Sequence, residues 1–62
     1  MIRMISVTGK SMKNYDAAAD NAVNTLIHQG EKVHYYRETM RTTTKHKNQS
    51  EYEVVLNVAI QI

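Results

Sequence analysis

The stretch that decides the fold runs from Asn14 to Gly30 and reads NYDAAADNAVNTLIHQG. Its apolar residues recur at intervals of three and four, the spacing of one stripe along an α-helix. They are Tyr15, Ala18, Ala19, Ala22, Val23, Leu26 and Ile27. Asn14 is typical of a helix N-cap, Asp16 suits the positive end of the helix dipole, and Gly30 favours the left-handed conformation that ends helices. We therefore expect one amphipathic helix whose stripe the rest of the chain must cover.

The segment before this helix has the composition of a β-strand. Residues 2–8, IRMISVT, are rich in β-branched side chains and predict a first strand. Residues 8–11, TGKS, predict a turn in which Gly9 supplies a backbone conformation that other residues avoid. A strand thus leads through a short turn into the helix.

Two further strands follow the helix. Residues 32–44 have high strand propensity but weak alternation, and the polar residues 45–50 predict a hairpin turn. The last stretch alternates without a break, which places six apolar residues on one strand face that we assign to the helix. They are Tyr52, Val54, Leu56, Val58, Ile60 and Ile62. The opposite face of this strand is mixed, with Val55 and Ala59 among polar residues.

The predicted order is β-α-β-β, an α+β fold in a single domain over residues 1–62. A right-handed crossover makes the first two strands parallel, and the hairpin returns the third antiparallel to both. The most apolar strand should lie in the middle of this three-stranded sheet, with one helix covering one face. The other sheet face then has no cover within the chain, so we expect another subunit or a ligand there.

Size and composition favour self-association. A chain of 62 residues has a marginal core of its own, and it contains no cysteine for disulfides or thiolate metal sites. No segment resembles a signal peptide or a membrane span, so the expected location is the cytoplasm. The net charge of +2 does not by itself indicate nucleic-acid binding.

The segments Val7-Thr8-Gly9-Lys10-Ser11 and Ala17-Ala18-Ala19-Asp20, with Tyr15 and Ala22, resemble the dodecin family. The carboxyl-terminal strand, from Tyr52-Glu53-Val54 to Asn57-Val58-Ala59-Ile60, is similar to that family's final strand. This resemblance implies a hollow homododecamer with the helix outside a curved sheet. It also implies that flavins such as riboflavin, FMN or FAD are stored between symmetry-related subunits and are not turned over.

The resemblance departs from the flavin-binding pattern at two positions. The family stacks flavin on a tryptophan of the second strand, and Tyr35 stands at that position here. Glu53 stands where a glutamine usually hydrogen-bonds the edge of the flavin ring. Tyrosine still stacks on flat aromatic ligands, but an ionised carboxylate only accepts hydrogen bonds. Some relatives that lack the tryptophan are associated with calcium, so a flavin-free dodecin-like module, structural or cation-binding, is the alternative.

The expected ligand site therefore combines a stacking ring with charged groups that orient the ligand. Its residues are Tyr35, Glu53, Arg37, Lys45 and Lys47. The basic residues, together with Arg41 and His46, would meet the phosphates of FMN, FAD or coenzyme A. Each residue also has an ordinary structural interpretation. One of Tyr35 and Tyr36 packs in the core or in a subunit contact while the other lies on the surface, Glu53 pairs with Arg37 or Arg41, and the lysines solvate a hairpin tip.

Other functions have weaker support in the sequence. Aromatic and basic side chains on a sheet could bind single-stranded nucleic acid, but no RNA-binding signature is present. The three histidines match no zinc spacing, and Asp16 with Asp20 supplies too few oxygens for calcium. No arrangement of nucleophile, base and carboxylate is present, so we do not expect an enzyme.

Overall fold

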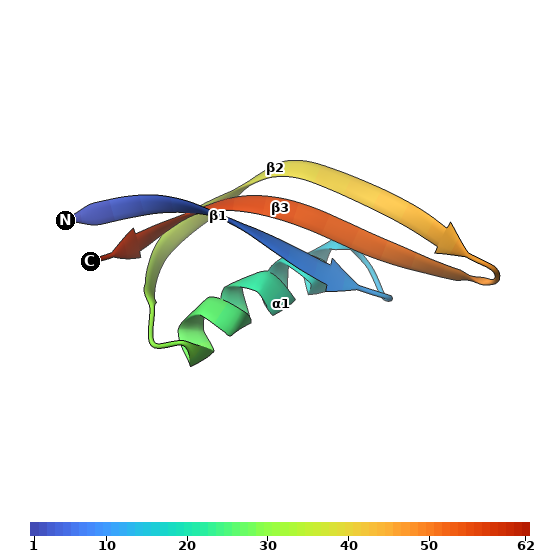
Figure 1. Cartoon of the computed structure of the whole chain (residues 1–62), viewed down its shortest axis with the longest axis horizontal. Coiled ribbons are helices and arrows are strands. Elements are labelled where there is room, and N and C mark those ends of the chain that lie inside the picture. Colours follow the sequence, from blue (N-terminus) through green and yellow to red (C-terminus); the bar gives the residue numbers. More distant parts are fainter.

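The computed structural model describes residues 1–62 and shows four elements in the order β-α-β-β (Figure 1). They are β1 (Ile2–Ser11), α1 (Tyr15–His28), β2 (Lys32–His46) and β3 (Gln49–Gln61). The three strands form one sheet, and α1 packs against one of its faces. This architecture confirms the predicted α+β fold.

Both predicted ends of α1 are confirmed. The side chain of Asn14 accepts a hydrogen bond from the Ala17 N–H at 2.7 Å, which satisfies one of the free donors of the first turn. At the other end Gly30 has a φ of 87°, in the left-handed region. The Glu31 N–H then reaches the Leu26 carbonyl at 3.0 Å, the bond that closes a Schellman motif.

The sheet order is β1-β3-β2, with β3 antiparallel to both neighbours. The most apolar strand therefore occupies the centre, and β1 and β2 run parallel to each other at the edges, as predicted. Pairing between β1 and β3 is unbroken from Ile2 to Ser11, whereas β2 carries irregularities at His34 and Thr39. Each bulge adds one residue to β2, so residues two apart on either side of it, such as Val33 and Tyr35, fall on opposite faces of the sheet.

The core lies between α1 and one face of β3. Its buried members are Ala18, Ala22, Leu26, Val54, Leu56, Val58 and Ile60. They come from the predicted helix stripe and the predicted strand face, so both patterns point to the core. The predicted burial is wrong at the carboxyl-terminal end of each pattern. Ile27 of the helix is 53% exposed, and Ile62, beyond the end of β3, is 69% exposed.

Two predicted turns differ from the structure. Residues 8–11 form no turn, because β1 continues to Ser11 and Gly9 is a buried strand residue beneath the helix. The hairpin turn is also tighter than residues 45–50. Its tip is Lys47 and Asn48, and Lys47 is in the left-handed region at a φ of 56°. Strand β2 therefore continues to His46.

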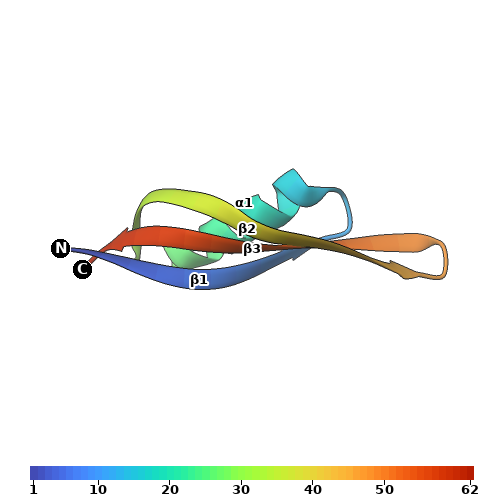
Figure 2. The same ribbon diagram turned by 90° about the horizontal axis from the view of Figure 1, so that it is seen from above.

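The molecule is elongated, with principal extents of 45 × 21 × 12 Å. The β2–β3 hairpin extends well beyond the helix, and the two chain termini lie side by side at the opposite end (Figures 1 and 2). There the Ile62 N–H donates to the Met1 carbonyl at 3.0 Å. The one helix is too short and too polar to cross a membrane.

Candidate functional site

The sheet face opposite α1, called the open face below, has no cover within the chain. Alternation along the strands and the pairing register define its members. They are Ile2, Met4, Ser6, Thr8 and Lys10 of β1, Glu53, Val55, Asn57 and Ala59 of β3, and Tyr35, Arg37, Met40 and Thr42 of β2. Its apolar members include Met4 and Met40, which are 51% and 61% exposed.

One row across the open face is apolar from edge to edge. Met4 and Tyr35 lie on either side of Ala59 in the register of the sheet. Ala59 is fully buried although it does not belong to the core beneath the helix, because its larger neighbours shield its small methyl group. The Tyr35 side chain is 59% exposed. This row offers an accessible aromatic ring beside a thioether and a methyl group, a surface suited to a flat apolar partner.

The predicted partners of Tyr35 lie at very different distances along the same face. Arg37 belongs to the next row, opposite Asn57, about 7 Å from the Tyr35 row at the usual strand spacing. Glu53 lies six residues from Ala59 along β3, about 20 Å away. The structure therefore brings Tyr35 and Arg37 together and places Glu53 farther from Tyr35 of the same subunit than the length of a single stacked ring system.

Glu53 has a different ionic partner from the one predicted. Its carboxylate lies 3.5 Å from the Lys10 ammonium group on β1, its direct cross-strand neighbour. The expected pair with Arg37 or Arg41 is wrong, since Arg37 is two rows away and Arg41 points to the other face of the sheet.

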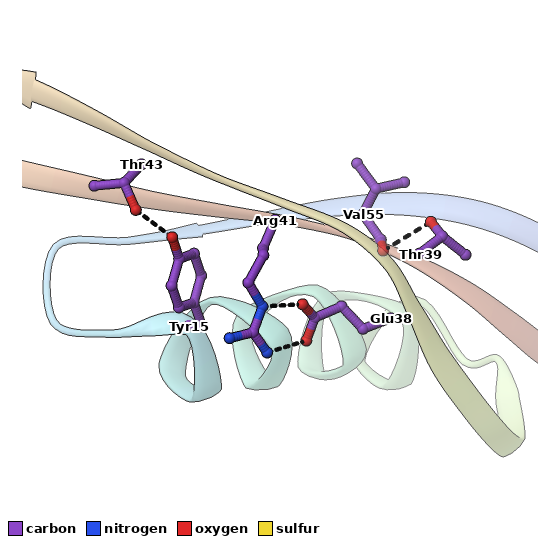
Figure 3. A network of polar contacts seen from close by, with 6 residues as sticks. All are labelled: Tyr15, Glu38, Thr39, Arg41, Thr43 and Val55. Carbon is purple, nitrogen blue, oxygen red and sulfur yellow. Dashed lines mark hydrogen bonds and ion pairs between the residues drawn. The ribbon is translucent and has the colours of Figure 1, made fainter.

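Arg41 belongs to a polar network beside the helix (Figure 3). Its guanidinium group donates to both carboxylate oxygens of Glu38, with the Nη2 to Oε2 bond at 2.9 Å, and lies 4.5 Å from the centre of the Tyr15 ring. The Tyr15 hydroxyl is hydrogen-bonded to Thr43, and its ring contacts Tyr52 edge-on. Hydrogen bonding to Arg41 holds the pKa of the Glu38 carboxyl below its ordinary value.

The predicted basic patch is therefore divided among separate surfaces. Arg37 lies on the open face, Arg41 is engaged on the helix side, and Lys45 and Lys47 lie near the hairpin tip. Lys45 pairs with Ser50, nine residues along β3 from Ala59, so it stands about 30 Å from the Tyr35 row. These cations do not converge on one ligand within a subunit.

The isolated subunit contains neither a pocket nor a cluster of three or more side chains suited to a metal ion. His34 is hydrogen-bonded to Gln61 at 2.9 Å, whereas His46 pairs with Gln49 beside the hairpin turn. The two exposed tyrosines also differ. Tyr36 pairs with Val58 on the helix side and is 45% exposed, so neither tyrosine packs in the core.

Sequence reasoning missed two residues of this site. Met4 belongs to the Tyr35 row and Asn57 to the Arg37 row, but the sequence separates both from Tyr35 by more than twenty residues. Only the pairing of both edge strands with β3 brings them together. A prediction of the register, anchored on Ala59, could have found them.

The sequence matches no protein-family profile and no curated protein. Solved structures do match. The dodecin from Streptomyces davaonensis superposes with a TM-score of 0.92 at 16% identity, over 100% of this chain and 93% of the other. Variants of Thermus thermophilus dodecin, one with an arginine replaced by alanine and one with a tryptophan replaced by phenylalanine, superpose with TM-scores of 0.91 at 19% identity. Both cover 100% of this chain and 94% of the other. At such identities the likeness concerns the fold: this chain has the dodecin fold.

Proposed function

We propose that this chain, a small protein with the dodecin fold, forms a homo-oligomer that stores or sequesters flavin between its subunits. The observation that carries the proposal is the apolar row on the open face, in which exposed Met4 and Tyr35 lie on either side of the buried Ala59. An aromatic ligand placed between two copies of this row removes apolar surface from water on both sides of its ring. The function is binding, without turnover.

The roles of the two nearest residues follow from their positions. Tyr35 stacks on the ring system, with less area and a weaker face than a tryptophan would offer. Arg37, one row away on the same face, pairs with the phosphate of FMN or FAD. Riboflavin, which has no phosphate, gains nothing from Arg37.

Glu53, Lys45 and Lys47 act in such a site only from another copy of the chain. Each lies about 20 Å or more from Tyr35 along its own subunit, which exceeds the length of an isoalloxazine ring. A complete site therefore takes Tyr35 and Arg37 from one subunit and the acidic and lysine side chains from a neighbour. A monomer would lack three of the five binding groups.

Flavin titration tests this proposal. Adding the assembled protein to riboflavin or FMN should quench flavin fluorescence, and Tyr35→Ala should abolish the quenching. Tyr36→Ala is the matched control, because it removes the adjacent tyrosine from the helix side of the sheet and should leave quenching intact. Absence of quenching by folded, assembled wild-type protein well above micromolar concentration would reject flavin as the ligand.

A flavin-free structural or interaction module is the second candidate function. The absence of any tryptophan favours it. Native mass spectrometry and absorbance of freshly purified protein separate the two functions. A colourless oligomer with no bound small molecule, still unable to take up added flavin, would support the module. A cation bound between subunits would appear in the same spectra as a metal adduct.

A further inference from the structure

Thr39 is the extra residue of the second bulge in β2, and its side chain hydrogen-bonds across the sheet (Figure 3). Its hydroxyl donates to the Val55 carbonyl of β3 at 3.1 Å. A bulge interrupts the ladder of backbone hydrogen bonds between two strands. No other side chain of β2 hydrogen-bonds to the backbone. The Thr39 hydroxyl therefore adds a cross-strand hydrogen bond at the point where the ladder is interrupted.

The bulge decides which face of the sheet the later residues of β2 occupy. Pairing with β3 steps directly from Glu38 to Met40 and skips Thr39. If no residue were skipped, each later residue of β2 would move one place along β3. Arg41 would then lie opposite Glu53, on the open face. The skipped residue thus determines whether Arg41 faces the helix or the open face.

The hairpin beyond the bulge does not fix its register by a hydrophobic pattern. Residues 41–46 of β2, RTTTKH, are all polar, so both faces of this part of the strand are polar. Strands of this kind specify their register weakly, and a slip of one residue turns every side chain to the other face. A specific contact is therefore needed to select one register.

The observed register gives Arg41 its partners beside the helix. Its guanidinium group donates to Glu38 and lies 4.5 Å from the centre of the Tyr15 ring, and Thr43 is hydrogen-bonded to the Tyr15 hydroxyl. In the slipped register Arg41 would meet the carboxylate of Glu53 instead. Because a carboxylate is available to Arg41 in either register, its ion pair alone does not select between them.

We propose that Thr39 is a positioning residue whose hydroxyl holds the bulge in place and keeps Arg41 on the helix side of the sheet. The hydrogen bond to Val55 fixes the extra residue between Glu38 and Met40, so the bulge does not move along the hairpin towards its turn. This role concerns the register of β2. It goes beyond the proposed function and does not depend on any ligand.

Cross-strand NOEs in NMR spectra test this role, since they report which residues of the two strands are paired. Wild-type protein and Thr39→Ser, which keeps the hydroxyl, should both show Thr42 opposite Glu53. Thr39→Val replaces the hydroxyl with a methyl group of similar size and should place Arg41 opposite Glu53. In Thr39→Val alone, the pKa of Glu38 should rise towards its ordinary value, because Arg41 has left it.

Deletion of Thr39 is the second test, and it decides even if Thr39→Val does not fold. A hydroxyl that serves only to hold an extra residue is not needed in a chain without that residue. The deletion variant should therefore fold with Thr42 still opposite Glu53. A deletion variant that is unfolded, or that pairs Arg41 with Glu53, would overturn the proposal. Native pairing in Thr39→Val, with an unchanged Glu38 titration, would overturn it as well.

Discussion

A Cβ atom placed on Gly9 would lie 2.8 Å from the Cβ of Ala22 on the helix above it. The same atom would overlap the backbone carbonyl oxygen of Ala18. Strand β1 and helix α1 therefore approach so closely that only glycine fits at this position. Small residues on both sides, glycine below and alanine above, set the distance between the two layers.

Gly9→Ala is expected to destabilise the fold by about 3 kcal/mol, because a backbone oxygen cannot move aside as a flexible side chain can. The midpoint of urea denaturation at fixed protein concentration measures this effect. Thr8→Ala, on the open face of the same strand, is the control and should change the midpoint much less. A Gly9→Ala protein as stable as wild type would show that the two layers are not in such close contact.

The pair of Glu38 and Arg41 predicts a specific pH dependence. Hydrogen bonding to Arg41 lowers the pKa of Glu38 in the folded state, so the pair stabilises the fold above the carboxyl's ordinary pKa. This stabilisation is lost as the pH falls through the lowered value. In Arg41→Ala, NMR titration of the Glu38 side-chain carboxyl should show its pKa returning upward towards the ordinary value. Arg37→Ala, on the opposite face, should leave the Glu38 titration unchanged, and an equal shift in both variants would contradict this pairing.

The open face predicts a charge-sensitive association. Met4→Glu places a carboxylate beside Ala59 and Tyr35, where a covering subunit would have to desolvate it. Sedimentation velocity should show smaller species for this variant than for wild type. Met12→Glu makes the same change at an exposed position between β1 and α1 and should sediment like wild type. Normal assembly of Met4→Glu would mean that this part of the open face is not an interface.

The N-cap of the helix gives a further prediction. Asn14→Ala removes the acceptor of the Ala17 N–H and should cost about 1 kcal/mol of stability. Asn24→Ala, at an exposed mid-helix position, should cost nothing, since alanine is the better helix former. Equal stabilities of the two variants in thermal denaturation would argue against the cap.

The fold was predictable because its local signals agree with one another. The stripe of Ala18, Ala22 and Leu26 and the alternation of Val54, Leu56 and Val58 both identify buried faces, and the structure packs these faces together. The turn predicted at Gly9 was wrong because a glycine required by close packing looks in sequence like a glycine required by a turn. The predicted turn began one residue after the predicted strand ended at Thr44, but Lys45 and His46 remain in β2, because pairing with β3 extends the hairpin.

The site was less predictable than the fold because it depends on register. The sequence identifies Tyr35 and Arg37 as neighbours on one strand, and the structure keeps them on one face. Nothing in the sequence indicates that Glu53 lies several rows of the sheet away from Tyr35, or that its ionic partner is Lys10 and not an arginine. The bulges at His34 and Thr39 shift which β2 residues share a face, and no alternation rule predicts their positions.

Solution mass tests the central claim most directly. In the proposed assembly, copies of the chain cover the open face and complete a ligand site that no single subunit contains. Native mass spectrometry or sedimentation equilibrium at micromolar concentration should therefore give a homo-oligomer, and the resemblance noted in the sequence leads us to expect twelve subunits. A well-folded species at the single-subunit mass of 7.1 kDa under those conditions would contradict the claim, and with it any site shared between neighbours.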